Sequence, residues 1–230
     1  MPHRLTVPAF RSVSIDAAGV SLHGDLVIPP DSHGLVVFAH GSGSGRLSPR
    51  NQRVAERLRQ AKLATLLFDL LTPSEDAVDR ETGHLRFDIG LLATRLVGVA
   101  DWISGTADVL ALPLGYFGAS TGAAAALVAA GMQPKRIRAV VSRGGRPDLA
   151  GRFLGQVEAA TLLIVGGCDA PVLRFNQEAM AQMQRAHTRL IIIPGATHLF
   201  EEPGTLDQVA LHASDWFDQY LGASAGLTVA

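Results

Sequence analysis

The chain has 230 residues and a formal net charge of -1, from 20 Lys and Arg against 21 Asp and Glu. This balance lacks the basic excess typical of a nucleic-acid-binding protein, so no nucleic-acid partner is expected. The single cysteine, Cys168, excludes an intrachain disulfide and a cysteine-based zinc site, and no pair of the eight histidines has metal-binding spacing beside an acid, so no metal is expected.

The N-terminal stretch, Met1 to Val20, mixes Arg4, Arg11 and Asp16 with apolar residues and lacks the continuous apolar segment of a secretory signal. Apolar runs elsewhere are well below the roughly 18 to 20 residues that a membrane-spanning helix needs. We therefore expect a cytoplasmic protein without a membrane partner. The length predicts one domain over residues 1–230.

Alternation of apolar and polar residues on both sides of Ala18-Gly19 predicts an antiparallel hairpin of Ser12–Asp16 and Val20–Ile28. Later segments are continuous apolar runs, typical of strands buried on both faces: Leu35–Ala39, Ala64–Phe68, Leu114–Phe117, Ile137–Val141, Thr161–Val165 and Leu190–Ile193. Segments with helical spacing alternate with them: Arg50–Lys62, Phe87–Ile103, Thr121–Gly131, Val172–His187 and Leu206–Leu221. This order predicts an α/β fold with a mostly parallel twisted sheet and helices on both faces.

Two connections bear on access to a site. Leu70 to Arg86, rich in charge and carrying Pro73 and Gly83, is predicted to be the longest irregular surface loop. Between the strand ending at Val141 and the next strand, only Ser142 to Gln156 is available. The sequence therefore predicts no large lid.

The pentapeptide Gly118-Ala119-Ser120-Thr121-Gly122 lies between a short apolar strand and a run of helix formers. A strand-to-helix corner of this kind strains the serine backbone, and the flanking glycines let strand and helix approach closely. The corner leaves the serine hydroxyl exposed above the sheet. A Gly-rich packing turn is the structural alternative, so the context of the pentapeptide decides between the two.

The ends of two later strands carry the partners that a nucleophilic serine needs. Asp169 follows the strand Thr161–Val165, and His198 follows Leu190–Ile193. Each alone has a structural explanation, Asp169 as a helix cap and His198 as a surface histidine. Together with Ser120 they stand in the order nucleophile, acid, histidine, each after its own strand, which is the order of the α/β-hydrolase triad.

The chain resembles an α/β-hydrolase of the dienelactone-hydrolase-like group from Leu35 through Gly222. The resemblance is carried by Phe38-Ala39-His40-Gly41-Ser42-Gly43, Gly118-Ala119-Ser120-Thr121-Gly122, Gly166-Gly167-Cys168-Asp169 and Gly195-Ala196-Thr197-His198-Leu199-Phe200. It implies the fold and the triad logic of that family. Dienelactone hydrolases proper use a cysteine nucleophile, whereas position 120 is serine, so the family's substrate is not carried over.

In this interpretation Ser120 is the nucleophile, His198 is its base and then the acid for the leaving group, and Asp169 orients the imidazole. An oxyanion hole needs two N–H donors, one from the residue after the nucleophile, Thr121, and one from the loop after the first buried strand. Ser42 is the predicted second donor.

The rest of the loop from His40 to Gly45 allows other readings. Gly43 is the next candidate after Ser42 and a tentative substrate contact, whereas His40 is expected to hold the loop by hydrogen bonding. Gly41, Gly43 and Gly45 could cradle a phosphate, but their spacing matches neither Gly-x-Gly-x-x-Gly nor a Walker loop.

Two arginines follow the strand Ile137–Val141. Arg143 and Arg146 could reach an anionic substrate, and Arg143 is kept as a tentative substrate-binding residue. An ion pair within the loop, to Asp148, is the favoured alternative.

The sequence thus predicts a serine hydrolase that cleaves a carboxylic ester or related small acyl substrate through an acyl-enzyme, without a cofactor. An acyltransferase with the same intermediate and a non-catalytic ligand-binding protein of this fold are the alternatives. The expected partner is a small-molecule ester, and a homo-oligomer is compatible with the sequence.

Overall fold

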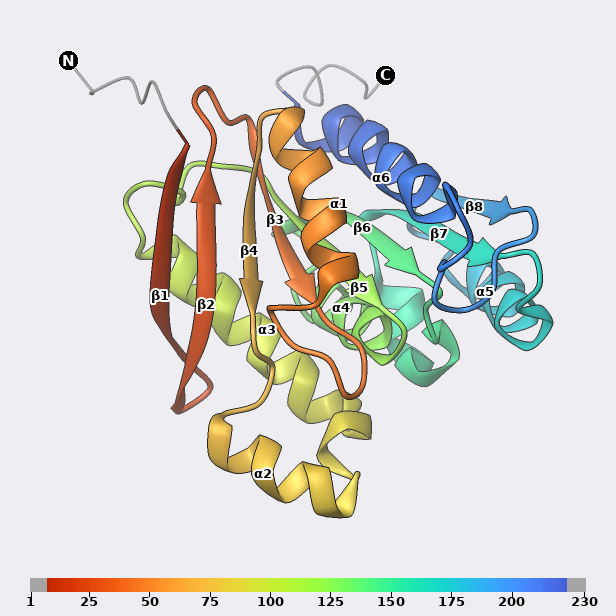
Figure 1. Cartoon of the computed structure of the whole chain (residues 1–230), viewed down its shortest axis with the longest axis horizontal. Coiled ribbons are helices and arrows are strands. Elements are labelled where there is room, and N and C mark those ends of the chain that lie inside the picture. Colours follow the sequence, from red (N-terminus) through yellow and green to blue (C-terminus); the bar gives the residue numbers. More distant parts are fainter. Residues whose placement is uncertain (1–7, 223–230) are drawn as a thin grey trace.

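The computed structural model describes residues 8–222, which form an eight-stranded sheet in the order β1-β2-β4-β3-β5-β6-β7-β8 (Figure 1). The strands are β1 Ala9–Ala17, β2 Val20–Ile28, β3 Gly34–Ala39, β4 Leu63–Phe68, β5 Leu114–Ala119, β6 Ile137–Arg143, β7 Ala160–Gly166 and β8 Thr188–Ile193. Strands β1 and β2 form an antiparallel hairpin, β2 runs antiparallel to β4, and the other pairs are parallel. The predicted hairpin and mostly parallel sheet are confirmed. The expectations for Met1 to Val20 and for residues 1–230 extend, at 1–7 and 223–230, beyond the described residues.

Helices cover both faces of the sheet, as predicted. They are α1 Pro49–Gln60, α2 Pro73–Thr82, α3 Ile89–Ser104, α4 Thr121–Met132, α5 Ala170–Gln182 and α6 Thr205–Leu221, with 3-10 helices Leu85–Phe87 and Pro147–Gln156. Helices α1 and α6 pack on one face, and α3, α4 and α5 on the other (Figure 1). No helix between residues 8 and 222 is both long enough and apolar enough to cross a membrane.

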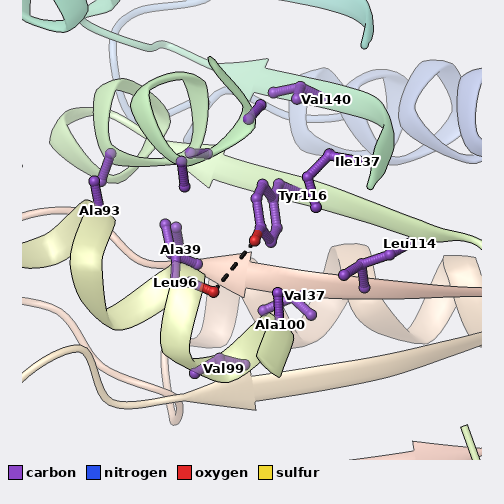
Figure 2. Packing of buried hydrophobic residues seen from close by; sticks show 14 of the residues in the cluster. Val37, Ala39, Ala93, Leu96, Val99, Ala100, Leu114, Tyr116, Ile137 and Val140 are labelled. Carbon is purple, nitrogen blue, oxygen red and sulfur yellow. Dashed lines mark hydrogen bonds between the residues drawn. The ribbon is translucent and has the colours of Figure 1, made fainter. Parts of the chain in front are cut away.

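The hydrophobic core on the side of α3 and α4 holds in position the corner that follows β5. Figure 2 shows Tyr116 of β5 between these elements, with its hydroxyl donating to the carbonyl of Leu96 at 3.2 Å. Tyr116 is fully buried, and this burial raises its pKa. Helix α4 consists largely of alanine and glycine and is buried along almost its whole length, so it lies close to the sheet. This close packing fixes the start of α4 directly beyond the end of β5.

The prediction of an irregular loop from Leu70 to Arg86 is wrong, because Pro73–Thr82 within it forms helix α2. The helix begins with a capping box: the Thr72 hydroxyl accepts from the Glu75 N–H, and the Glu75 carboxylate accepts from the Thr72 N–H. Glu75 also pairs with the buried Arg95 of α3 at 2.7 Å. The Thr-x-x-Glu spacing was the available signal, although few apolar residues accompany it.

Strand β8 also departs from the prediction. The apolar run Leu190–Ile193 was expected to be buried on both faces, but β8 is the edge of the sheet and Ile192 is 44% exposed. An apolar run identifies a strand without identifying its neighbours, and β8 has only β7 beside it. The connection after Val141 contains a 3-10 helix whose Leu154 is buried, so no large lid is present here, as predicted.

Candidate active site

Ser120 lies at the corner between β5 and α4 with φ 51° and ψ -120°, a region that non-glycine residues rarely adopt. The flanking glycines are required sterically. A Cβ on Gly118 would lie 2.3 Å from Cα of Ala123, and one on Gly122 would lie 2.3 Å from the carbonyl oxygen of Ala39. The strained corner predicted from the pentapeptide is therefore present.

Replacing Gly122 with alanine is expected to lower the free energy of unfolding by about 1–3 kcal/mol or more, because the new methyl group would collide with the backbone after β3. Helix propensity alone favours alanine over glycine in α4, so the steric term reverses the expected sign. Urea unfolding measures the change. The control is Gly155→Ala, whose Cβ would meet nothing nearer than 3.9 Å and should leave stability within about 0.5 kcal/mol. Equal stability of both variants would contradict the steric argument.

The structure brings Ser120, Asp169 and His198 together. His198 Nδ1 is 2.7 Å from Asp169 Oδ2, and His198 Nε2 is 3.3 Å from Ser120 Oγ. Because a carboxylate only accepts, Nδ1 carries the proton and the Nε2 lone pair faces the serine hydroxyl. Asp169 stands at the cap position of α5, yet its side chain makes no capping bond. Its carboxylate contacts the imidazole, which disfavours the helix-cap alternative.

The loop before α6 is braced around His198 by residues that the sequence did not single out as functional. The Thr197 hydroxyl and N–H both donate to the Glu202 carboxylate, at 2.6 and 3.2 Å, and the hydroxyl bond in particular lowers the pKa of Glu202. Gly144 lies behind the ring, where a Cβ would be 3.6 Å from His198 Cε1. Proximity to His198 in sequence was the only signal for Glu202, and Gly144 had none.

The loop after β3 packs against the serine corner. The Ser42 hydroxyl is 2.9 Å from the Thr121 hydroxyl, which places the two predicted oxyanion-hole residues side by side. A Cβ on Gly41 would lie 3.3 Å from Cβ of Ser120, so glycine permits this close approach. The backbone of this loop is therefore adjacent to the serine.

His40 holds this loop, as predicted. Its Nδ1 donates to the carbonyl of Gly41, and its Nε2 accepts from the N–H of Leu70, both at 3.0 Å. Burial lowers the pKa of His40 below 6.5, and the hydrogen bond to Gly41 opposes this only in part. The imidazole is thus neutral in the folded protein, and it ties the loop to the segment after β4.

The protein should become less stable as the pH falls, and His40 should account for part of this loss. Because its folded pKa is lowered, the unfolded chain binds the extra proton first, so the His40 contribution is present above pH 6.5 and is lost as pH falls below it. Urea unfolding from about pH 8 to pH 5 should show a smaller decline in His40→Gln than in the native chain. Parallel declines in the two proteins would show that another group is responsible.

A cavity of about 20 Å³ adjoins the contact between Ser42 and Thr121. Its walls include Gly43 on the serine side, together with Leu71 and Leu92. Gly43 has φ 67°, and a Cβ there would lie 3.7 Å from the Arg86 guanidinium. The segment predicted to be a surface loop therefore forms one wall of this cavity, and the substrate contact of Gly43 stays a prediction.

The two predicted loop arginines have different surroundings. Arg146 forms the expected ion pair with Asp148, through bonds of 2.9 and 2.7 Å, and its guanidinium lies over the ring of Phe175. Arg143 is instead 8% exposed and is not among the residues that line the cavity beside Ser42. Within residues 8–222, no group of His, Cys, Asp or Glu side chains could hold a metal ion.

The sheet order, the strained corner and the placement of Ser120 and His198 at strand ends define an α/β-hydrolase fold. A dienelactone hydrolase from Anabaena variabilis is 59% identical in sequence, with a TM-score of 0.91 over 93% of this chain and 98% of that one. The chain belongs to the dienelactone-hydrolase group of this superfamily. A lidless α/β serine hydrolase from Xanthomonas campestris shares the fold at 20% identity, with a TM-score of 0.72 over 97% of this chain and 99% of that one.

A curated relative from Mycobacterium tuberculosis is 57% identical over 211 residues, 92% of this chain. The chain spans about half of that relative, 46% of its length, and the relative's name assigns it provisionally to the phosphoribosyl transferases. No protein-family model matches the chain.

Proposed function

We propose that the chain is a serine hydrolase that cleaves a carboxylic ester or a related small acyl compound through an acyl-enzyme. The observation that carries this proposal is the line of contacts from Asp169 through His198 to the hydroxyl of Ser120, at a corner with a strained serine backbone. A serine hydroxyl is a weak nucleophile until a base takes its proton, and the lone pair of His198 Nε2 faces that hydroxyl.

In the proposed reaction, Ser120 Oγ attacks the acyl carbon while His198 Nε2 takes its proton. The backbone N–H groups of Thr121 and Ser42 donate to the resulting oxyanion, each contributing about 3–4 kcal/mol of transition-state stabilisation. His198 then protonates the leaving group, and water, activated by the same ring, releases the acid. Asp169 keeps the proton on Nδ1 throughout and stabilises the imidazolium.

The alternatives make different products. An acyltransferase would use the same acyl-enzyme and deliver the acyl group to an added alcohol, and a product assay separates the two. A non-catalytic binding protein would form no acyl-enzyme. We propose that the phosphoribosyl transferase name of the curated relative describes the part of that protein outside the matched 46%. A dienelactone hydrolase of similar length to this chain, at 59% identity, supports this assignment.

Labelling with a fluorophosphonate, followed by peptide mapping with mass spectrometry, tests the proposal. The adduct is expected on Ser120, because His198 is within hydrogen-bonding distance of its hydroxyl. Asp169→Asn should label much more slowly, because its imidazole is no longer held in the reactive tautomer. An adduct on Ser42 or Ser44, or no adduct, would refute the assignment.

Substrate size should be limited by the lack of an apolar shelter beside Ser120. Long acyl chains need apolar shelter, which stabilises them by about 0.8 kcal/mol for each buried methylene. The cavity beside Ser42 has a volume of about 20 Å³ and includes Asp76, Asp79 and Arg86 among its walls, so it offers little shelter. Activity on p-nitrophenyl esters should peak at about two to six acyl carbons and then fall. Measuring kcat/KM up to palmitate checks this, and a steady rise with chain length would reveal an apolar acyl site elsewhere.

A further inference from the structure

Arg143, the last residue of β6, is a buried cation without a carboxylate beside it. The residue is 8% exposed, and its Nε and Nη1 are buried without a hydrogen-bond partner among the described residues. Burial lowers the pKa of Arg143 to about 10, so the guanidinium remains protonated at neutral pH. Buried charges in proteins are ordinarily paired and hydrogen-bonded.

The neighbouring charge that acts on the pKa of Arg143 is positive. After burial, the next influence that lowers the pKa of Arg143 is the charge of Arg50, at the start of α1. The Nε of Arg50 is also buried without a partner, and its Nη1 contacts Glu201 at 3.3 Å. The first turn of α1 carries no acidic residue, so the positive end of the helix adds to the same field.

We propose that Arg143, Arg50 and the N-terminus of α1 form a binding site for a small oxyanion, such as phosphate or a carboxylate. Three buried donors, the Nε and Nη1 of Arg143 and the Nε of Arg50, lack partners. An oxyanion matches the planar donor fork of a guanidinium, would neutralise Arg143 and could also accept from the free Nε of Arg50. Arg50 already pairs with Glu201, so water would satisfy the donors but would leave the charge of Arg143 without a counter-ion.

The proposed site adjoins the catalytic groups through the backbone at the end of β6. The carbonyl of Arg143 accepts from the N–H of Ser120 at 3.1 Å, and the next residue, Gly144, packs on His198. Arg50 reaches the His198 loop through Glu201. The β6 residues Ala139 and Val141, which share a face with Arg143, pack in the core on the α1 and α6 side. The cavity beside Ser42 is instead bounded by residues of α2 and α3.

Thermal unfolding in phosphate, acetate or chloride at equal ionic strength tests the site. A saturable rise in Tm with phosphate, about 3–5 °C at tenfold over its dissociation constant, is expected, with little effect of chloride. Arg143→Met should weaken phosphate binding about tenfold or more, since it loses charge-assisted hydrogen bonds. Arg53→Met removes an equal charge from an exposed position on α1 and should bind phosphate like the native chain.

If Arg143→Met does not fold, Arg50→Met provides the same comparison from a side chain that is 35% exposed. The absence of an anion-specific shift, or an equal shift in the variants and the native chain, would overturn the proposal and leave water as the occupant. Ester kinetics in the presence of phosphate identify the source of the oxyanion. If phosphate raises the KM of a neutral ester without changing kcat, the site binds an anionic group of the substrate. If phosphate raises Tm but leaves the KM unchanged, the site binds a free anion.

This inference does not depend on the proposed hydrolase activity. Ser120→Ala keeps both arginines and should retain the phosphate-dependent Tm shift. A loss of catalysis with an intact shift, or the reverse, therefore separates the two proposals.

Discussion

Ser120→Ala is expected to lower kcat on a short-chain p-nitrophenyl ester by about 10⁶-fold, the scale of nucleophile loss in an unrelated serine protease. Alanine cannot form the acyl-enzyme, and His198 then has no hydroxyl to deprotonate. The remaining rate should come from the donors of the oxyanion hole and from substrate binding, so KM should change little. A stopped or continuous assay of p-nitrophenol release measures the loss of kcat.

The matched control is Ser42→Ala. The proposed role of Ser42 uses its backbone N–H, which alanine retains, and the variant loses only the hydroxyl contact to Thr121. A neutral hydrogen bond contributes about 1 kcal/mol, so the loss of rate should be roughly tenfold or less. Activity of Ser120→Ala within tenfold of the native chain would place the nucleophile elsewhere.

Asp169→Asn should lower turnover by about 10⁴-fold, the effect of the same change in a serine-protease triad. The amide can donate to Nδ1, which turns the ring into the tautomer whose Nε2 carries the proton and cannot accept one from Ser120. It also removes the negative charge that stabilises the imidazolium. Comparison of kcat for the two proteins measures this effect, and circular dichroism confirms that both are folded.

Glu201→Gln is the control for the acid role. Glu201 is close to His198 in sequence, but its side chain is 64% exposed and contacts Arg50, so this variant should remain near the native rate. Near-native turnover in Asp169→Asn, together with an inactive Glu201→Gln, would transfer the acid role to Glu201.

Much of this architecture could be predicted from sequence because it follows from local rules. Continuous apolar runs alternating with helical spacing identified the strands and most helices. The corner at Ser120 was predictable because glycines on both sides admit the close approach seen at Ala39 and Ala123. Helix α2 was missed because its charged surface carries little apolar periodicity, although Thr72 and Glu75 had the spacing of a capping box.

The sequence by itself determined which residue types follow each strand. Strand ends and the order of Ser120, Asp169 and His198 are local properties that can be identified along the chain. Only the tertiary structure decided which of these side chains meet, since contacts such as that between His198 and Ser120, 78 residues apart, depend on the packing of separate elements. The same holds for Arg143. Its sequence context allowed an ion pair with Asp148 or a place at the substrate, and the pleat of β6 puts it on the sheet face that α1 and α6 cover. Burial and neighbouring charge are properties of the packed molecule, so no local pattern could have revealed them.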